Sequence, residues 1–135
     1  MSVKITIANW RPVAKGRPRT GNGRTYTPPK TRQAEELVAQ YGRIAMAGRP
    51  PIDGPLQIDI VFYFPIPKRT KKSDIPFFVG APKIGVPDVD NLCKTCFDAL
   101  NGIVYRDDNQ ICRITASKVY DLEPGCVITV EDYEL

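Results

Sequence analysis

The chain has 135 residues, of which 42% are hydrophobic and 25% charged, a composition typical of one globular domain with its own core. It has no histidine, which excludes a His general base, a Ser-His-Asp triad and the zinc sites that use His ligands. No apolar run approaches the roughly 20 residues that cross a bilayer, and residues 1–7 do not resemble a signal peptide, so we expect a cytoplasmic protein.

The net charge of +4 is distributed unevenly along the chain. Residues 1–50 hold ten Lys or Arg and two Asp or Glu, whereas residues 88–135 hold four and ten. A basic surface attracts polyanions because their binding releases condensed counterions. An acidic cluster suits a phosphate-binding protein only when cations bridge it to the substrate. The alternative is that both halves are solvated faces that keep the protein soluble.

The first half of the chain predicts a strand, a loop and a helix. Residues 3–8 alternate apolar and polar, which is typical of a strand. Gly and Pro punctuate residues 9–24, which predicts a loop, and residues 25–27 are expected to complete a hairpin. Apolar residues from Ala34 to Ala45 recur at helical spacing and predict a helix over about residues 29–47, with proline at its first turn.

The second half predicts three strands and one helix. Residues 56–64 are the clearest strand, and residues 65–85 look like a long loop. A helix at 90–100 precedes strands at 111–120 and 126–131, which we expect to pair as an antiparallel hairpin across a short turn. The order predicts an α+β fold, a single domain over residues 1–135 with one mixed β-sheet and two main helices packed on it.

Both predicted loops are rich in basic residues. Arginine binds phosphate through a planar fork, and glycine lets the backbone approach closely, so the loop at 9–24 is a candidate DNA- or RNA-binding segment. The loop at 65–85 is either a second phosphate contact or a solvated linker. The candidate DNA-binding residues are Lys15, Arg17, Arg19, Arg24, Lys68, Arg69, Lys71 and Lys72.

The helix at 90–100 has a polar face with a distinct charge pattern. Asp90, Lys94 and Asp98 are four residues apart, so their side chains lie above one another, opposite an apolar face. Asn101-Gly102 is typical of a helix end. In this position Lys94 could orient an attacking water or balance charge in a transition state.

Three carboxylates near this helix are candidate metal ligands. Asp88, Asp90 and Asp108 would meet if the segment after the helix folds back towards its start. Three carboxylates repel one another in a shared pocket unless a cation lies between them, and oxygen ligands indicate magnesium or manganese. Such a metal would polarise a phosphodiester and help to generate hydroxide. The alternative is structural: Asp90 is the N-cap of the helix, and 107–108 is a turn.

The pattern of the four cysteines predicts buried thiols without a metal-binding or redox role. Cys93 and Cys96 form a Cys-x-x-Cys pair on the apolar side of the predicted helix, and Cys112 and Cys126 do not form a second close pair. This arrangement matches neither a zinc site nor a thioredoxin-like site. We therefore expect buried thiols in a reducing compartment.

These residues together resemble the RusA-type Holliday junction resolvases, small endonucleases common on prophages. The similarity lies in Asp-x-Asp-Asn-Leu at 88–92 with Lys94, Asp-Ala-Leu-Asn-Gly at 98–102, and Asp-Asp-x-Gln at 107–110. Lys-Gly-Arg-Pro-Arg at 15–19 and Tyr-Thr-Pro at 26–28 resemble a variant of the family. The likeness therefore covers most of the chain.

The resemblance implies a homodimeric, magnesium-dependent endodeoxyribonuclease that makes paired symmetric nicks across four-way (Holliday) DNA junctions in recombination and repair. Two nicks on a two-fold symmetric substrate also call for two symmetric sites. Two other hypotheses stay open: a nucleic-acid-binding module without catalysis, and a nuclease for other branched DNA, flaps or RNA. The roles that the resemblance implies are metal binding by Asp88, Asp90 and Asp108, catalysis by these three with Lys94, and support by Asp98 and Asp107.

Overall fold

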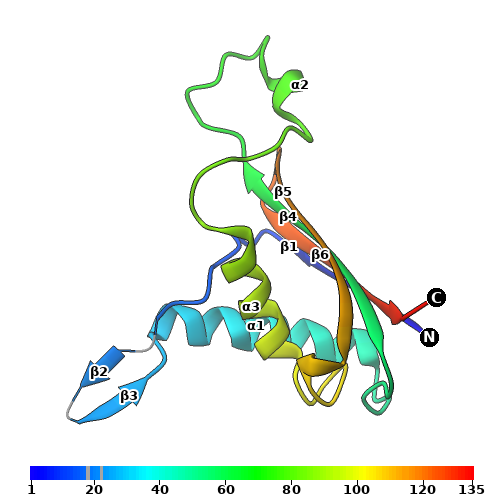
Figure 1. Ribbon diagram of the computed structural model, residues 1–135. Helices are drawn as coiled ribbons and strands as arrows, with labels where there is room; N and C mark the ends of the chain where they lie inside the picture. Colours follow the sequence, from blue (N-terminus) through cyan, green and yellow to red (C-terminus); the bar gives the residue numbers. More distant parts are fainter. Residues whose placement is uncertain (18, 22) are drawn as a thin grey trace.

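The computed structural model describes residues 1–17, 19–21 and 23–135 (Figure 1). Its strands and helices follow most of the predicted ranges within a residue or two. The elements are β1 (Ser2–Ala8), β2 (Arg19–Gly21), β3 (Arg24–Tyr26), α1 (Pro29–Met46), β4 (Leu56–Pro65), α2 (Ile75–Phe78), α3 (Val89–Leu100), the 3-10 turn η1 (Asp108–Gln110), β5 (Ile111–Asp121) and β6 (Gly125–Asp132).

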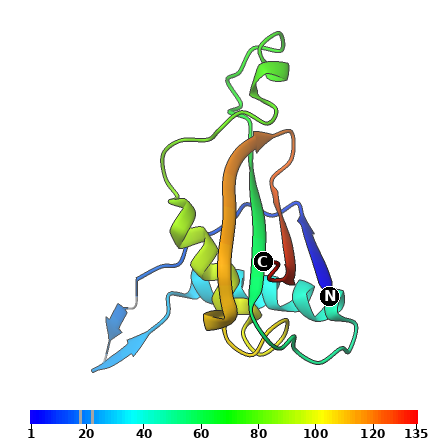
Figure 2. The same ribbon diagram turned by 45° about the vertical axis from the view of Figure 1, so that its right-hand side comes forward.

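Four strands form one mixed sheet in the order β1-β6-β4-β5. Strand β6 is antiparallel to both neighbours, and β4 is parallel to β5, with α3 in the connection between them. Helices α1 and α3 cover one face of the sheet (Figures 1 and 2). This arrangement confirms the predicted α+β fold with two main helices on a mixed sheet.

The core lies between the sheet and the two helices, as the alternating strand patterns require. In β4, Ile58, Ile60 and Phe62 point into it and are at most 2% exposed, whereas Asp59 is exposed on the other face. Burying a side chain of this size stabilises the fold by about 1.5–3 kcal/mol. Strand β4, which has the clearest strand pattern in the sequence, therefore packs against the helices from a central position in the sheet.

The two helices approach each other closely at Gly42. A Cβ atom at this position would lie 2.6 Å from Cδ2 of Leu100, which is itself fully buried. Only a residue without a side chain allows α1 and α3 to pack this tightly. The contact fixes the C-terminal half of α3 against α1.

The predicted hairpin between the last two strands is wrong, because β4 lies between β5 and β6. Strand β6 alternates buried and half-buried residues and takes a central position, whereas β5 has no buried residue and lies at the edge. Residues 122–124 cross over the end of β4. Two strand spacings amount to about 10 Å, which three extended residues can span. The short connection between β5 and β6 is therefore compatible with a third strand between them.

Two segments project from the body on either side of the N-terminal end of α3 (Figures 1 and 2). One is the antiparallel β2–β3 hairpin, which confirms the predicted hairpin, although β3 ends one residue earlier. The other is residues 66–85, predicted as a loop, which contains the single-turn helix α2. No helix in the described ranges is long and apolar enough to span a membrane.

Candidate active site

Helix α3 separates the predicted site residues from the core. Leu92 and Leu100 on its inner face are at most 1% exposed, and Asp90, Lys94 and Asp98 are exposed on the outer face. The sequence pattern predicted both faces correctly. The acidic and basic side chains therefore stand in a row on a rigid helix that the core holds in place.

The first two carboxylates lie at the N-terminal end of α3. Asp88 is the N-cap residue, so the interpretation of Asp90 as the N-cap is wrong; Asp90 lies in the first turn. The Asp88 side chain makes no capping hydrogen bond with the backbone. Both carboxylates are exposed. The positive end of the helix dipole favours negative charge at this position.

Two lysines fix the segment that leads into Asp88. Lys118 Nζ on β5 donates to the carbonyl oxygens of Gly85 (2.5 Å) and Pro87 (2.8 Å). Lys83 Nζ donates to the carbonyl oxygen of Val86 (2.9 Å). These contacts anchor the backbone immediately before the carboxylate pair. The sequence analysis did not single out either lysine, because each is isolated in the sequence.

The third candidate ligand lies at the other end of α3. The backbone N–H of Asp108 donates to Oδ1 of Asn101, the residue at the C-terminus of the helix (2.8 Å). Asp107 caps the following 3-10 turn and accepts a hydrogen bond from the N–H of Asn109 (2.9 Å). The predicted turn at 107–108 is therefore present, and it presents Asp108 beside Asp98.

Carboxylates crowd this second end. Burial, the hydrogen bond and charge of Asp107, and the charge of Asp98 together raise the pKa of Asp108 above its ordinary range. Several carboxylates therefore lie close together at this end of α3. A divalent ion would relieve this repulsion in the same way that a proton does.

The carboxylates of one chain form two separate groups. Asp90 and Asp98 are eight residues apart, which is about 12 Å along a helix, and Asp108 lies near Asp98. The segment after α3 therefore does not bring Asp108 back to Asp88 and Asp90. Among the residues that the structure describes, no three His, Cys, Asp or Glu side chains gather in a possible metal site. The predicted ligand set of one chain does not fit a single metal ion.

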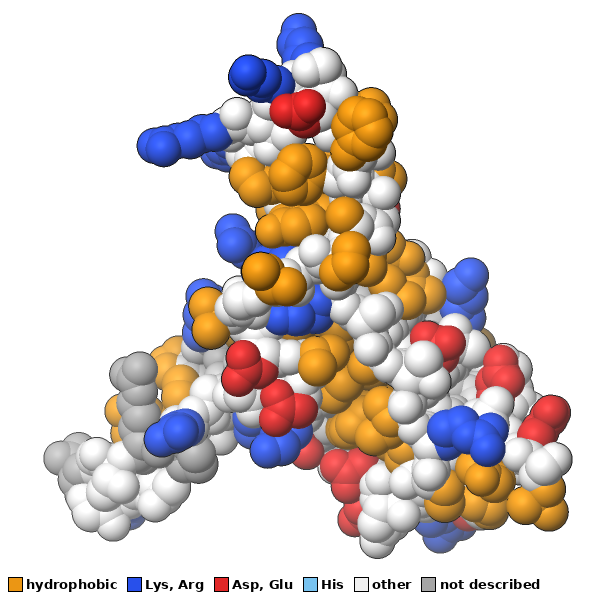
Figure 3. Space-filling view, turned by 45° about the horizontal axis from the view of Figure 1, so that its top comes forward, with side chains coloured by type: hydrophobic (Ala, Val, Ile, Leu, Met, Phe, Trp, Pro, Cys, Tyr) orange, Lys and Arg blue, Asp and Glu red, His pale blue; other side chains and the backbone are white. Residues whose placement is uncertain are grey.

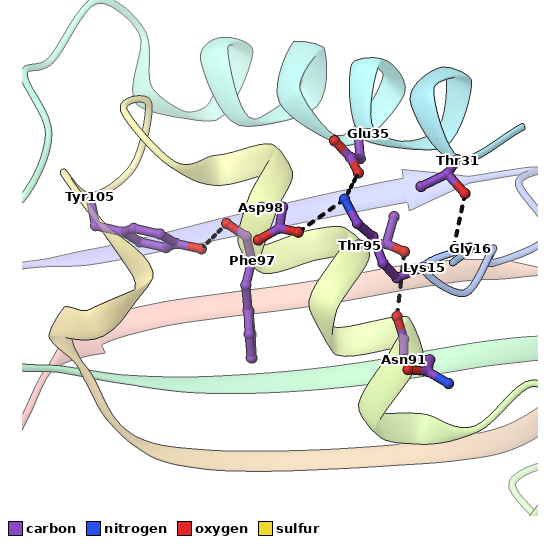
Figure 4. A network of polar contacts seen from close by, with 9 residues as sticks. All are labelled: Lys15, Gly16, Thr31, Glu35, Asn91, Thr95, Phe97, Asp98 and Tyr105. Carbon is purple, nitrogen blue, oxygen red and sulfur yellow. Dashed lines mark hydrogen bonds and ion pairs between the residues drawn. The ribbon is translucent and has the colours of Figure 1, made fainter. Parts of the chain in front are cut away.

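Lys15 forms a charged contact that the sequence analysis did not predict (Figure 4). Its Nζ lies 2.5 Å from Oε1 of Glu35 on α1 and 3.1 Å from Oδ2 of Asp98 on α3. Its backbone N–H donates to the carbonyl oxygen of Asn91 (3.0 Å). Lys15 therefore joins the first loop to both helices. The prediction that it contacts DNA stays open, but its ammonium is engaged by two carboxylates.

Further polar contacts in Figure 4 hold the same region together. The N–H of Gly16 donates to Oγ1 of Thr31 (3.0 Å), and Thr31 is only 2% exposed. The fully buried Tyr105 donates its hydroxyl hydrogen to the carbonyl oxygen of Phe97 near the end of α3 (2.8 Å). These bonds tie the first loop to α1 and the end of α3 to the segment that carries Asp108.

The other predicted DNA-binding residues lie on the two projections. Figure 3 shows Lys and Arg side chains at the tip of the 66–85 projection and acidic side chains on the body between the two projections. The side chain of Arg19 lies outside the described part of the chain. Exposed basic side chains are those of Arg17, Arg24, Lys68, Arg69, Lys71 and Lys72.

The prediction of buried cysteines is confirmed for three of the four and is wrong for Cys112. Cys93, Cys96 and Cys126 are buried free thiols, and Cys112 is exposed. Burial raises the pKa of Cys93 to about 12. The pKa of Cys96 is also raised, by its hydrogen bond with Cys126 and by burial. Neutral thiols of this kind serve as small apolar core residues.

The site consists of exposed carboxylates on one helix, with a basic projection on either side. Such an arrangement on a small α+β domain is typical of an enzyme that acts on nucleic acid. The comparisons with known proteins agree. The chain belongs to the RusA endodeoxyribonuclease family, since the family model described as "Endodeoxyribonuclease RusA" matches residues 9–131. Membership implies an endonuclease that resolves Holliday junctions. The chain is also similar to a Bacillus subtilis (strain 168) protein named "Uncharacterized protein YqaN", 34% identical over 141 residues, with 96% of each chain covered.

Proposed function

We propose that this protein is a magnesium-dependent endodeoxyribonuclease that resolves four-way DNA junctions by paired symmetric nicks in recombination and repair. The observation that carries the proposal is the pair Asp88 and Asp90, which are exposed at the start of α3. This end of α3 lies between the two basic projections (Figures 1 and 2). Basic projections suit the phosphates of two DNA arms, which they would bind independently of sequence. Manganese would serve in place of magnesium, since both take oxygen ligands.

The metal site of this proposal is shared between two copies of the chain. In one chain, Asp90 stands about 12 Å along the helix from Asp98, and Asp108 lies near Asp98, so the described residues of one chain form no joint metal site. In a two-fold symmetric dimer with antiparallel α3 helices, the start of one helix lies beside the end of the other. Asp88 and Asp90 would then face Asp108 of the partner subunit. The crowding of Asp98 and Asp107 around Asp108 supports this arrangement, because a divalent cation held there would offset the repulsion between these carboxylates.

A cation at such a site would polarise the phosphodiester and lower the pKa of water. The chain's own residues would position the substrate. Lys94 stands one helical turn from Asp90 and from Asp98, so its ammonium would contact the phosphate that reaches the carboxylates. Asp107 would hold the turn that presents Asp108, as its capping bond does now.

A nicking assay on a labelled four-way junction and on linear duplex of the same sequence tests this function. The proposal predicts paired cuts on the junction only, lost with chelator and in Asp90→Asn. Asp59→Asn is the matched control, because Asp59 is exposed on the sheet face away from the helices, and it should cut like wild type. Junction binding without cuts in any metal would instead favour the non-catalytic binding module. Cuts on flaps or RNA alone would favour the other nuclease hypothesis.

A further inference from the structure

A pocket lies beside Asp88 and is separate from the carboxylates of the candidate active site. It has a volume of about 590 Å³ and lies between the first loop, the start of α1 and residues Val86 and Pro87. Pockets that bind small organic groups have volumes of about 300–1,000 Å³. This pocket is therefore large enough to hold one molecular group rather than a few waters.

The lining combines apolar walls with a basic rim. The basic side chains are Arg11, Arg17 and Lys30, all exposed, and the described part of the lining contains no Asp or Glu. None of the three forms an ion pair with a carboxylate in the described ranges. Such a lining suits a ligand with an apolar body and a negative charge. The apolar walls are formed by Pro12, Val13, Ala14, Pro28, Val86 and Pro87.

Positive charge also gathers behind one wall of the pocket. Burial and the charges of Lys118 and Arg11 lower the pKa of Lys83. Lys83 and Lys118 already donate to backbone carbonyls of residues 84–87, so they stiffen the wall that Val86 and Pro87 form. Cations that approach one another without a carboxylate repel, and a bound phosphate would offset that repulsion.

The position of the pocket limits the choice of ligand. Pro87 forms part of the wall and directly precedes Asp88. Whatever occupies the pocket is therefore adjacent to the phosphodiester that the proposed function brings to the carboxylates. In a nucleic acid, each phosphate is close to a base, and the base is the group with an apolar, flat body.

We propose that this pocket binds one unstacked nucleotide of the junction, next to the phosphodiester that is cut. The inference rests on the proposed function. The base lies against the proline and valine walls, and its phosphate contacts Arg11 and Lys30. Moving a base out of the stack costs least where its pairing is already disrupted, as it is at a branch point. A pocket that accepts some bases better than others would also give the enzyme a sequence preference at the cut.

The test uses four-way junctions that carry 2-aminopurine at single positions near the branch point. This base fluoresces weakly when stacked and brightly when unstacked, and no aromatic side chain lines the pocket to quench it. Fluorescence is measured with saturating protein and chelator, so that no cutting occurs. The variant Arg11→Met/Lys30→Met removes two rim charges, and Lys4→Met/Arg32→Met removes two exposed charges elsewhere. Lys30→Met alone is a second, milder variant.

The proposal predicts a fluorescence rise at one position with the wild type. The rise should fall about threefold or more in the Arg11→Met/Lys30→Met variant, because neither side chain could then contact the phosphate of the unstacked nucleotide. The Lys4→Met/Arg32→Met variant should keep it. Junction binding without a rise at any position would overturn the pocket proposal and leave the proposed function standing, as would an equal rise in all variants. A wild-type protein that binds no junction would overturn both.

Discussion

Replacing Lys15 with methionine removes the charge that joins the first loop to both helices. Its Nζ lies 2.5 Å from Glu35 Oε1 and 3.1 Å from Asp98 Oδ2, and the Lys15 and Glu35 side chains are each 25% exposed. A hydrogen bond to a charged group contributes about 1.5–3 kcal/mol when buried, and exposure to water reduces this. For two bonds in this partly exposed site we expect Lys15→Met to lower the free energy of unfolding by about 2 kcal/mol.

Urea unfolding followed by far-UV circular dichroism measures this change. Lys4→Met is the matched control, because Lys4 is exposed on β1, and its effect should stay within about 0.5 kcal/mol. The double variant Lys15→Met/Glu35→Gln should lose less than the sum of the single changes, since both remove one interaction. A loss from Lys15→Met no larger than that of the control would refute the reasoning.

The same contact predicts a pH dependence. Burial lowers the pKa of Lys15, but its hydrogen bonds with Glu35 and Asp98 and their charges raise it more, so the net pKa lies above the ordinary value of 10.5. The stabilisation is therefore fully present below the unfolded pKa and is lost as the pH rises through the folded pKa. Wild type and Lys15→Met should converge in stability at strongly alkaline pH.

Three other predictions concern the end of α3 and the cysteines. Tyr105→Phe should lower the free energy of unfolding by about 1 kcal/mol in urea unfolding, because it removes the buried bond to the Phe97 carbonyl. Asp108→Asn should raise the melting temperature at neutral pH, because the raised pKa of Asp108 means that its ionised form is repelled in the folded state. This gain should disappear as the pH falls below the unfolded pKa, where both states are protonated, and a loss of stability at pH 7 would contradict it. A thiol reagent should modify Cys112 rapidly in the native protein and the three buried cysteines only after unfolding, so several fast-reacting thiols would count against the structure.

Local patterns were enough to predict most of the fold. The alternation in β4 and the helical stripe of α3 each depend on one burial preference, which a short window of sequence contains. The pairing of β5 was not local, because its parallel partner β4 is separated from it by α3 and the long 66–85 segment. For this reason the sequence predicted the strands correctly but paired β5 with the wrong neighbour.

In the candidate site, too, local features could be predicted from the sequence and contacts between distant residues could not. The face that Asp90 and Lys94 share follows from helix geometry, so the sequence predicted it. The position of Asp108 depends on the Asn101 side chain and on a 3-10 turn, neither of which has a strong sequence pattern. The Lys15 contact joins residues from three parts of the chain and could not be read from any one of them.

The most direct test of the proposed site uses dimers built from two different variants. Asp90→Asn and Asp108→Asn chains with different affinity tags are co-expressed, and heterodimers are purified and assayed for nicking of a four-way junction with magnesium. If each site takes Asp90 from one copy and Asp108 from the other, one heterodimer site carries both substitutions and the other carries none. The heterodimer should then nick at about half the wild-type rate, while both variant homodimers stay inactive. An inactive heterodimer beside an active wild type would contradict the shared site.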